Sequence, residues 1–393
     1  MLGEHVYRNG ANLVNLTTRK SLPLASEPHV LKRHAFLAGQ EEDAIRTALS
    51  ETERLSHINI TVIPTWRCNL RCSHCFVMHK LKKTGDSHID VDKLYAFVNK
   101  LKSIHKNITS IRILFVGGEA TLNADLCLEV IKKAPRDLKY SFDMTSNGIL
   151  LNEKILKLYS SLDDFMISLD GTNQTHNTQR ISLDKIDDPY TITYNNIKRL
   201  VLYGLRDKMK VQSALPSTVH NAEVGRIFYK QMLLAGVRLD RIIFGSTTPT
   251  NINPSFDPAR VKITQSKAIY ARPCCKFRLD SNYVIDDQNT VYTDYFQNSD
   301  YSYLGTLDED IKSIHDRHLK MIMSDIPVLN DEKCKKCPVV GVCWGWCASS
   351  HKHYKPSDYC SQTEIHNNAK AAAADGKLEL LSTKSPLQFT NAE

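Results

Sequence analysis

The sequence predicts an α/β fold: a mostly parallel sheet curved into a partial, TIM-like (β/α)6 barrel, with a small cysteine-rich, loop-rich C-terminal domain. From residue 58 onward, short apolar runs typical of buried strands alternate with segments whose apolar residues recur at helical spacing. Such alternation favours parallel strands joined by right-handed crossover helices. The eleven cysteines are grouped, with three at 68–75, two at 274–275 and five between 334 and 360. The last group predicts the second domain.

The strands of the barrel are expected at six apolar runs. They are Ile60–Ile63, Ile111–Val116, Tyr140–Met144, Phe165–Leu169, Val211–Leu215 and Ile242–Phe244. The helices between them are expected at Val91–Ile104, Leu126–Ile131, Glu153–Tyr159, Asn195–Tyr203 and Val224–Leu234. In such folds the chemistry collects where the strands end, at their carboxyl termini. Motifs that follow these runs are therefore the candidates for a functional site.

Four segments are predicted along the chain: an appendage at 1–57, the barrel at 58–250, the cysteine-rich domain at 251–369 and a tail at 370–393. In the appendage, two alternating runs, Val6–Val14 and Ser21–Ala25, are joined by a polar turn. Two helical patterns follow them, at His29–Leu37 and Glu41–Leu49. The appendage is thus expected to be a small unit of strands and helices.

Composition limits the class of protein. The chain has 393 residues, 42% of them hydrophobic, and no run approaches the roughly 18 apolar residues of a membrane helix. The polar N-terminus, Met1–Gly10, lacks the apolar region of a signal peptide, so a cytoplasmic location is expected. In that reducing compartment, eleven cysteines indicate metal binding rather than disulfides.

The formal net charge of +8 is moderate and its basic residues are spread rather than blocked. The sequence lacks the interleaved basic and aromatic residues that would indicate a nucleic-acid partner. The charge instead favours an acidic partner, such as an electron-transfer protein or an acidic peptide.

The stretch from Thr65 to Phe76 contains Cys68, Cys72 and Cys75, spaced Cys-x3-Cys-x2-Cys. Three thiolates in so short a loop suit a 4Fe-4S cluster, because each sulfur can bind one iron. The fourth iron then has no protein ligand and can chelate the amino and carboxylate groups of a small molecule. The alternative is a zinc ion, which needs a fourth ligand from a nearby His.

Short polar motifs follow the next three predicted strands. They are Gly117-Gly118-Glu119, Thr145-Ser146-Asn147-Gly148 and Ser168-Leu169-Asp170-Gly171, the last followed by His176, Asn177 and Arg180. Glycines let the backbone approach a ligand closely, and a carboxylate can bind an ammonium group. Each motif alone is also compatible with an ordinary turn or helix cap. Their occurrence at successive strand ends favours a site.

The cysteine spacing, with aromatic Phe76 after the last Cys, resembles the signature of the radical S-adenosylmethionine (SAM) enzymes. The Gly-Gly-Glu motif matches the methionine-binding motif of that family, although Ala120 replaces the usual Pro. The resemblance implies that SAM binds a 4Fe-4S cluster on the three cysteines. The cofactor-binding residues that it implies are Gly117, Gly118, Glu119, Ser146, Asn147, Ser168, Asp170 and Arg180. Of these, Ser168 and Asp170 would lie near the ribose, and Arg180 near the cofactor carboxylate or the substrate.

The second cysteine group reads Cys334-x2-Cys337-x5-Cys343-x3-Cys347, with Cys360 following. It resembles the SPASM domain of radical SAM peptide and protein maturases, which holds two auxiliary iron-sulfur clusters. The resemblance implies that Cys334, Cys337, Cys343 and Cys360 bind one cluster, while Cys347 binds the other.

The upstream part of that domain departs from the family pattern, in which a Cys is followed by a Gly and a second Cys. Here Cys275 is followed by thirteen residues, Asn289, four residues and Asp294. Asp294 is therefore expected either as an unusual iron ligand or, if the frame slips by one residue, as a catalytic base. Cys274 is a further candidate ligand. Sulfatase maturases of this family carry their Asp base where this chain has Tyr295.

From about residue 58 to residue 362, the sequence resembles a radical SAM maturase with a ribosomally made peptide as its substrate. The resemblance implies a 5′-deoxyadenosyl radical that abstracts hydrogen and leads to a cross-link or another side-chain modification. It also implies a precursor peptide and a low-potential flavodoxin- or ferredoxin-type electron donor as partners. The appendage is similar to a leader-peptide recognition domain, but short for one, and a plain embellishment is an equal alternative.

Two other functions remain open on the sequence. One is formylglycine formation of the sulfatase-maturase type, against which Tyr295 argues. The other is a non-enzymatic iron-sulfur carrier or metal-stabilised scaffold, against which the strand-end motifs argue.

Overall fold

The computed structural model describes most of the barrel and parts of the flanking segments. The described residues are 6–9, 12–15, 21–23, 25–27, 32, 39–40, 43, 56–75, 77–81, 89–183, 187–215, 221–246, 282–293, 302–324 and 331–335. A search of this part of the chain for helices long and apolar enough to cross a membrane finds none.

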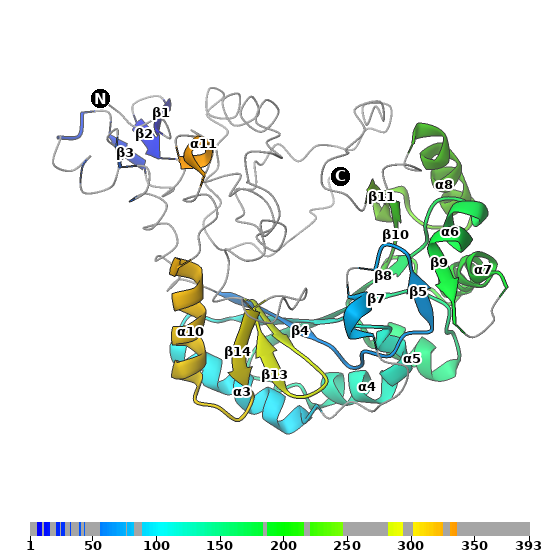
Figure 1. Cartoon of the computed structure of the whole chain (residues 1–393), viewed down its shortest axis with the longest axis horizontal. Helices are drawn as coiled ribbons and strands as arrows, with labels where there is room; N and C mark the ends of the chain where they lie inside the picture. Colours follow the sequence, from blue (N-terminus) through cyan, green and yellow to red (C-terminus); the bar gives the residue numbers. More distant parts are fainter. Residues whose placement is uncertain are drawn as a thin grey trace.

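The six predicted barrel strands are confirmed. They are β4 (His57–Val62), β6 (Ser110–Phe115), β7 (Lys139–Ser146), β8 (Asp164–Ser168), β10 (Met209–Leu215) and β11 (Ile242–Ser246). Neighbours pair in parallel in the order β11-β10-β8-β7-β6-β4. Figure 1 shows that this sheet curves without closing. All six strands therefore end along one rim.

Five helices cover the convex face of the sheet (Figure 1). They are α3 (Val91–Ile104), α4 (Ala124–Lys133), α5 (Glu153–Ser161), α7 (Pro189–Leu202) and α8 (Ala222–Leu234). In α3, Leu94, Phe97 and Leu101 are fully buried, so its apolar stripe packs on the strands. Helix α7 begins earlier than its apolar pattern predicts, because Asp188 caps it and Pro189 suits the first helical position.

Three further strands and a helix extend the sheet beyond β4. They are β12 (Asn282–Ile285), β13 (Thr290–Tyr292), β14 (Tyr303–Thr306) and α10 (Ile311–Ser324). Strand β12 pairs in parallel with β4, and β13 and β14 continue in antiparallel fashion. Helix α10 lies beside β14 and α3 (Figure 1). The first part of the predicted cysteine-rich segment thus continues the sheet, while the predicted boundary at 250 lies outside the described residues.

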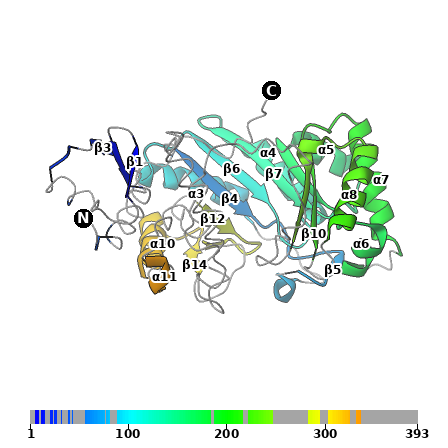
Figure 2. The same ribbon diagram turned by 90° about the horizontal axis from the view of Figure 1, so that it is seen from above.

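A short ribbon stands apart from the main sheet, formed by β5 (Leu70–Cys72) and β9 (Arg180–Ser182). Strand β9 follows helix α6 (Asn173–Gln179), which begins with a capping box at Thr172. The ribbon ties the cysteine loop to the chain that follows β8. Figure 2 shows β5 at the margin of the molecule, away from the long strands.

The N-terminal appendage contains a three-stranded antiparallel sheet of β1 (Val6–Asn9), β2 (Asn12–Asn15) and β3 (Ser21–Pro23). The single run expected at Val6–Val14 is wrong, since Asn9 pairs with Asn12 and the run folds back into a hairpin. The strand expected near Ser21 is confirmed. Both helical patterns of the appendage fall almost wholly outside the described residues.

Candidate functional site

The cysteine loop packs directly on the end of β6. The amide of Gly118 donates to the carbonyl of Thr65 at 3.0 Å, and that of Glu119 donates to the carbonyl of Arg67 at 2.7 Å. A Cβ on Gly118 would lie 2.1 Å from the Arg67 carbonyl oxygen, and Gly117 has a φ of +140°. The two glycines are therefore needed for close approach of the cysteine loop itself. Their predicted contact with a cofactor stays a prediction.

The three thiols of the loop are half-buried. The amide of Leu70 donates to Sγ of Cys68 at 3.4 Å. Burial raises the pKa of the Cys68 thiol to about 12, with smaller contributions from Glu119, Cys72 and Cys75. The sulfurs are thus close enough to repel one another as thiolates, a cost that a bound cationic centre would offset.

A single metal ion does not fit these groups. In the described part of the chain, no three His, Cys, Asp or Glu side chains lie close enough together to hold one ion. A 4Fe-4S cluster takes one sulfur at each of three separate irons and so accommodates thiols that are further apart. The loop therefore fits a cluster better than the zinc alternative.

Glu119 lies at the centre of a buried hydrogen-bond network, with only 2% of its surface exposed. Its Oε1 accepts from the amide of Thr121 at 3.2 Å, the hydroxyl of Thr121 at 2.6 Å and the hydroxyl of Ser146 at 2.8 Å. Among the residues that the structure describes, its Oε2 accepts only from the amide of Asn147, at 2.8 Å. No cationic side chain among the described residues pairs with it. Oε2 can therefore still accept a bond from a cation.

Ser146 holds Glu119 in place. Its hydroxyl donates to Glu119 and accepts from the Tyr159 hydroxyl at 2.9 Å and from the amide of Gly148 at 3.0 Å. One donor and two acceptors are the full capacity of a hydroxyl. The structure thus gives Ser146 a positioning role toward the carboxylate, and the direct cofactor contact expected from the sequence stays a prediction.

Asn147 joins the end of β7 to the cysteine loop. Its Nδ2 donates to Oδ1 of Asn69 at 2.7 Å, and its carbonyl accepts from the Thr193 hydroxyl of α7 at 3.1 Å. Asn196 of α7 also donates to the carbonyl of Gly148, at 2.9 Å. Three elements therefore fix this turn against the cysteines.

Asp170 and Arg180 form a buried ion pair beside the cysteines. Asp170 is fully buried, and its two oxygens accept from Nε of Arg180 at 2.6 Å, Nη2 of Arg180 at 3.2 Å and the amide of Ala214 at 2.9 Å. Nη1 of Arg180 points to Sγ of Cys72 at 3.9 Å. Burial alone would raise the pKa of Asp170, but the guanidinium and these hydrogen bonds hold it below its ordinary value.

Two histidines complete this side of the site. Nδ1 of His176 accepts from the amide of Asp170 at 3.0 Å, and burial lowers the pKa of His176 to about 3, so the ring is neutral. His74 places Nε2 3.6 Å from Oδ2 of Asp170. It therefore faces the carboxylate. Ser168 is half-buried at the end of β8, and its predicted place near a ribose stays a prediction.

Comparison with known proteins identifies this site. Residues 62–219, which include the cysteine loop and the ends of β4, β6, β7, β8 and β10, match the model of the radical SAM superfamily. The chain therefore contains a domain of the radical SAM superfamily. The matched residues form the radical SAM domain, and they contain the three loop cysteines, Glu119, Asp170 and Arg180.

Individual relatives match part of the chain. A cysteine-type anaerobic sulfatase-maturating enzyme of Clostridium novyi is 27% identical over 176 residues, 42% of this chain and 46% of that protein. The chain spans about half the length of the curated relatives it matches.

Solved structures confirm the predicted fold. Native anSMEcpe with bound AdoMet and Cp18Cys peptide superposes with a TM-score of 0.55 at 18% identity, covering 81% of this chain and 98% of that one. Streptococcus suis SuiB bound to precursor peptide SuiA gives a TM-score of 0.53 at 12% identity, covering 91% and 97%.

Beyond the radical SAM domain, only Cys334 of the predicted auxiliary ligands lies among the described residues. It is half-buried in α11 (Glu332–Lys335), and its amide donates to Oδ1 of Asp331 at 3.4 Å. The other candidates lie outside the described residues: Cys274, Cys275, Asp294, Cys337, Cys343, Cys347 and Cys360.

Asn289 is described, and it occupies the turn between β12 and β13 with a φ of +63°. Glycine is the usual residue for that left-handed conformation, and Asn is among the next best tolerated. The replacement of the expected family Gly by Asn is thus compatible with the backbone.

Sequence reasoning missed three residues of the network. Thr121 donates twice to Glu119, Asn69 binds Asn147, and Tyr159 binds Ser146. Thr121 has no clear signal in the sequence, because Glu is not among the usual residues that cap a turn or a helix. Tyr159 has none, since it occupies an apolar position of the α5 pattern.

Proposed function

We propose that this chain is a radical SAM enzyme that modifies a ribosomally made peptide. Cys68, Cys72 and Cys75 hold the 4Fe-4S cluster, and SAM lies over the ends of β6, β7 and β8. When bound and reduced, the cluster supplies an electron to the sulfonium of SAM and so gives a 5′-deoxyadenosyl radical for hydrogen abstraction. The observation that carries the proposal is that the cysteine loop packs against two residues with buried carboxylates, Glu119 after β6 and Asp170 after β8.

In this proposal the chain's own residues position the reactants. Oε2 of Glu119 accepts a hydrogen bond from the methionyl ammonium of SAM, and burial strengthens that bond. Ser146, Thr121 and Asn147 keep the carboxylate from turning away. The Asp170–Arg180 pair holds Cys72 from the other side. Fixed placement of cofactor and substrate carbon is the main contribution that a protein makes to such chemistry.

A peptide substrate is supported by the fold. The similar structures of anSMEcpe and SuiB contain bound peptides, and the comparison covers more than nine-tenths of each of those chains. The product we propose is a cross-link or another side-chain modification. Cytoplasmic placement and reduction by a flavodoxin- or ferredoxin-type protein belong to the same proposal.

Formylglycine formation is the second candidate, favoured by the match to the sulfatase-maturating enzyme of Clostridium novyi. Tyr295 stands where that class carries its Asp base, so we place this function second. A mass spectrum of a Cys- or Ser-containing sulfatase peptide after incubation with the enzyme decides between the two.

The core of the proposal is tested by cofactor cleavage. Reconstituted protein incubated anaerobically with dithionite and SAM should form 5′-deoxyadenosine, measured by liquid chromatography and mass spectrometry. Changing Cys68, Cys72 and Cys75 to Ala should abolish it while C-terminal iron is retained. Cys127→Ala is the matched control, because Cys127 is fully buried in the barrel core and outside the loop. Unchanged cleavage in the triple variant contradicts the proposal.

The auxiliary clusters are tested at Asp294. If Asp294 is an iron ligand beside Cys275 and Cys347, Asp294→Ala should lose iron, and Asp294→Cys should shift the reduction potential of that cluster. If Asp294 is instead the catalytic base, the Asp294→Asn variant should keep its iron and still cleave SAM but form no product. Iron analysis with electron paramagnetic resonance (EPR) on the three variants separates these roles.

A further inference from the structure

The β5–β9 ribbon has two different faces. Its strands are antiparallel, with Cys72 opposite Arg180 and Arg71 opposite Ile181. Successive side chains of a strand point to opposite faces. Cys72 and Arg180 therefore share the face turned toward the candidate cluster, while Arg71 and Ile181 share the other. One layer of backbone separates the cluster ligand from the outer face.

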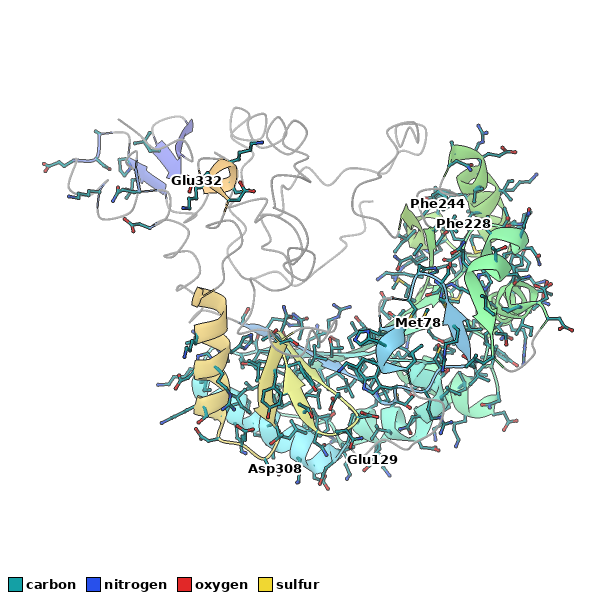
Figure 3. All side chains as sticks on the ribbon, viewed as in Figure 1. Met78, Glu129, Phe228, Phe244, Asp308 and Glu332 are labelled. Carbon is teal, nitrogen blue, oxygen red and sulfur yellow. The ribbon has the colours of Figure 1, made fainter. Side chains whose placement is uncertain are left out.

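The outer side of the ribbon exposes apolar side chains. Ile181 is 55% exposed, Leu183, which follows it on the same face, is 42% exposed, and Met78 is 43% exposed. Met78 lies in the 3-10 turn Met78–Lys80 that follows Cys75, and Figure 3 shows it beside β5. Single exposed apolar residues are common on protein surfaces, but three around one short ribbon form a patch.

The charge around this patch is mainly positive. Residues 65–81 contain Arg67, Arg71 and Lys80 and no Asp or Glu, whereas Arg180 of β9 is paired with buried Asp170, and Asp184 follows Leu183 in the sequence. The guanidinium of Arg71 donates to the carbonyls of Cys68 and Leu70, at 3.1 and 2.9 Å, and no carboxylate among the described residues forms an ion pair with it. Lys80 forms no ion pair with a described residue. The surface is thus apolar, basic and close to the cluster ligands.

We propose that the outer face of the β5–β9 ribbon, together with Met78 and Lys80, is the docking surface for an acidic electron-transfer protein. The inference rests on the proposed function, because the cluster must be reduced before SAM is cleaved. In each encounter the donor is oxidised by one electron and the cluster is reduced by one. Electron transfer slows steeply with distance, and a partner packed on this face is separated from Cys72 by the backbone of the ribbon.

Other exposed apolar residues lack these features. Leu202 is 85% exposed and Leu234 is 73% exposed, at the C-terminal ends of α7 and α8. Both lie on the outer helical layer (Figure 1), where none of the predicted cluster ligands occurs. They provide matched positions for a control.

The test compares a protein donor with a small one. The full reconstituted chain carrying Ile181→Glu or Lys80→Glu is mixed with an acidic flavodoxin in its hydroquinone state, and bleaching of the cluster absorbance is followed by stopped flow. We expect reduction at least tenfold slower than in wild type. Dithionite needs no docking surface, so it should reduce the cluster of the wild type and of each variant at the same rate. The wild-type rate with flavodoxin should fall as salt is added, because the attraction is screened.

Leu202→Glu is the control, since it places the same charge on an exposed apolar site away from the ribbon, and it should match wild type. Equal flavodoxin rates in Ile181→Glu, Lys80→Glu and Leu202→Glu overturn the inference, as does a wild-type cluster that the flavodoxin does not reduce. In both cases 5′-deoxyadenosine formation with dithionite still reports on the proposed function. Loss of that product with dithionite in wild type would instead count against the proposed function itself.

Discussion

The strand-end site and the contact between α10 and α3 differ in how their buried polar side chains are hydrogen-bonded. In the site, Glu119 and Asp170 accept hydrogen bonds on both oxygens. In the α10 contact, His318 is fully buried, and neither of its ring nitrogens has a hydrogen-bond partner within the described part of the chain. Its ring instead meets that of Tyr283 edge to face, with centroids 5.2 Å apart. The site depends on keeping its partners, whereas the α10 contact depends on a neutral ring.

Titration should separate the two regions. Burial, with the nearby His315 and His105, lowers the pKa of His318 to about 3, and burial with His315 lowers that of His105 to about 4. At a pH between the folded pKa and the unfolded pKa of about 6.5, these histidines are protonated in the unfolded chain but neutral in the folded protein. The free energy of unfolding therefore falls as the pH drops through that range. Asp170 has a lowered pKa, so its contribution is present above about pH 3.9 and is lost only below that.

The largest effect is expected from Asp170→Ala, which leaves the guanidinium of Arg180 buried without its carboxylate. Breaking a buried pair in this way costs about 3 to 5 kcal/mol of unfolding free energy. Asp308→Ala is the control, because the Lys93–Asp308 pair lies on the surface, with Asp308 65% exposed (Figure 3). Such a pair contributes about 0 to 1 kcal/mol. Urea unfolding measures both, and equal losses in the two variants would break the comparison.

Within the site, Glu119 differs from Asp170 because it has no cationic partner of its own. Glu119→Ala should therefore weaken SAM binding by about 1 to 3 kcal/mol, the range for a lost charge-assisted bond. Tyr159→Phe removes a bond from the same network without touching the carboxylate and should keep the wild-type affinity. Isothermal titration of SAM gives both values. An unaltered dissociation constant in Glu119→Ala would assign the carboxylate to structure alone.

Lowering the pH should destabilise the packing of α10 before it affects the strand-end site. With an unfolded pKa of about 6.5, His318 alone should cost about 1.4 kcal/mol of stability at pH 5.5 relative to pH 7.5. His318→Phe keeps the ring and its burial but cannot titrate, so its unfolding free energy should depend less on pH by that amount. Urea unfolding at both values measures the difference. Parallel pH profiles for the two proteins would show that the ring has a partner in solution.

Much of the fold is predictable because the barrel elements are long and periodic. All six strands, and helices such as α3, follow from apolar spacing. The β5–β9 ribbon was missed because each strand has three residues and their pairing joins positions more than 100 apart. Helix α6, Asn-Gln-Thr-His-Asn-Thr-Gln, has no apolar stripe and relies on its cap. The cysteines and Glu119 were found because their chemistry is local in sequence. Their shared contacts, such as Asn69 with Asn147, depend on folding.

The smallest effect concerns the hairpin of β12 and β13. Residue 289 has a φ of +63°, in the left-handed region. Ala adopts this conformation less readily than Asn does, whereas Gly adopts it without steric strain. Both variants lose the bond from the Asp90 amide to Oδ1 of Asn289, of 2.9 Å, so their difference isolates the backbone term. Ala should be less stable than Gly by about 1 kcal/mol in thermal unfolding. Equal stabilities would mean that the turn relaxes.

The most direct test of the central claim is the EPR spectrum of the dithionite-reduced protein, recorded with and without SAM. If Cys68, Cys72 and Cys75 hold a cluster whose fourth iron is open, adding SAM should change the spectrum of the wild type. The variant with all three changed to Ala should lose that SAM-dependent change and keep only signals from C-terminal clusters. A wild-type spectrum that SAM leaves unchanged, or the same change in the triple variant, would contradict the account.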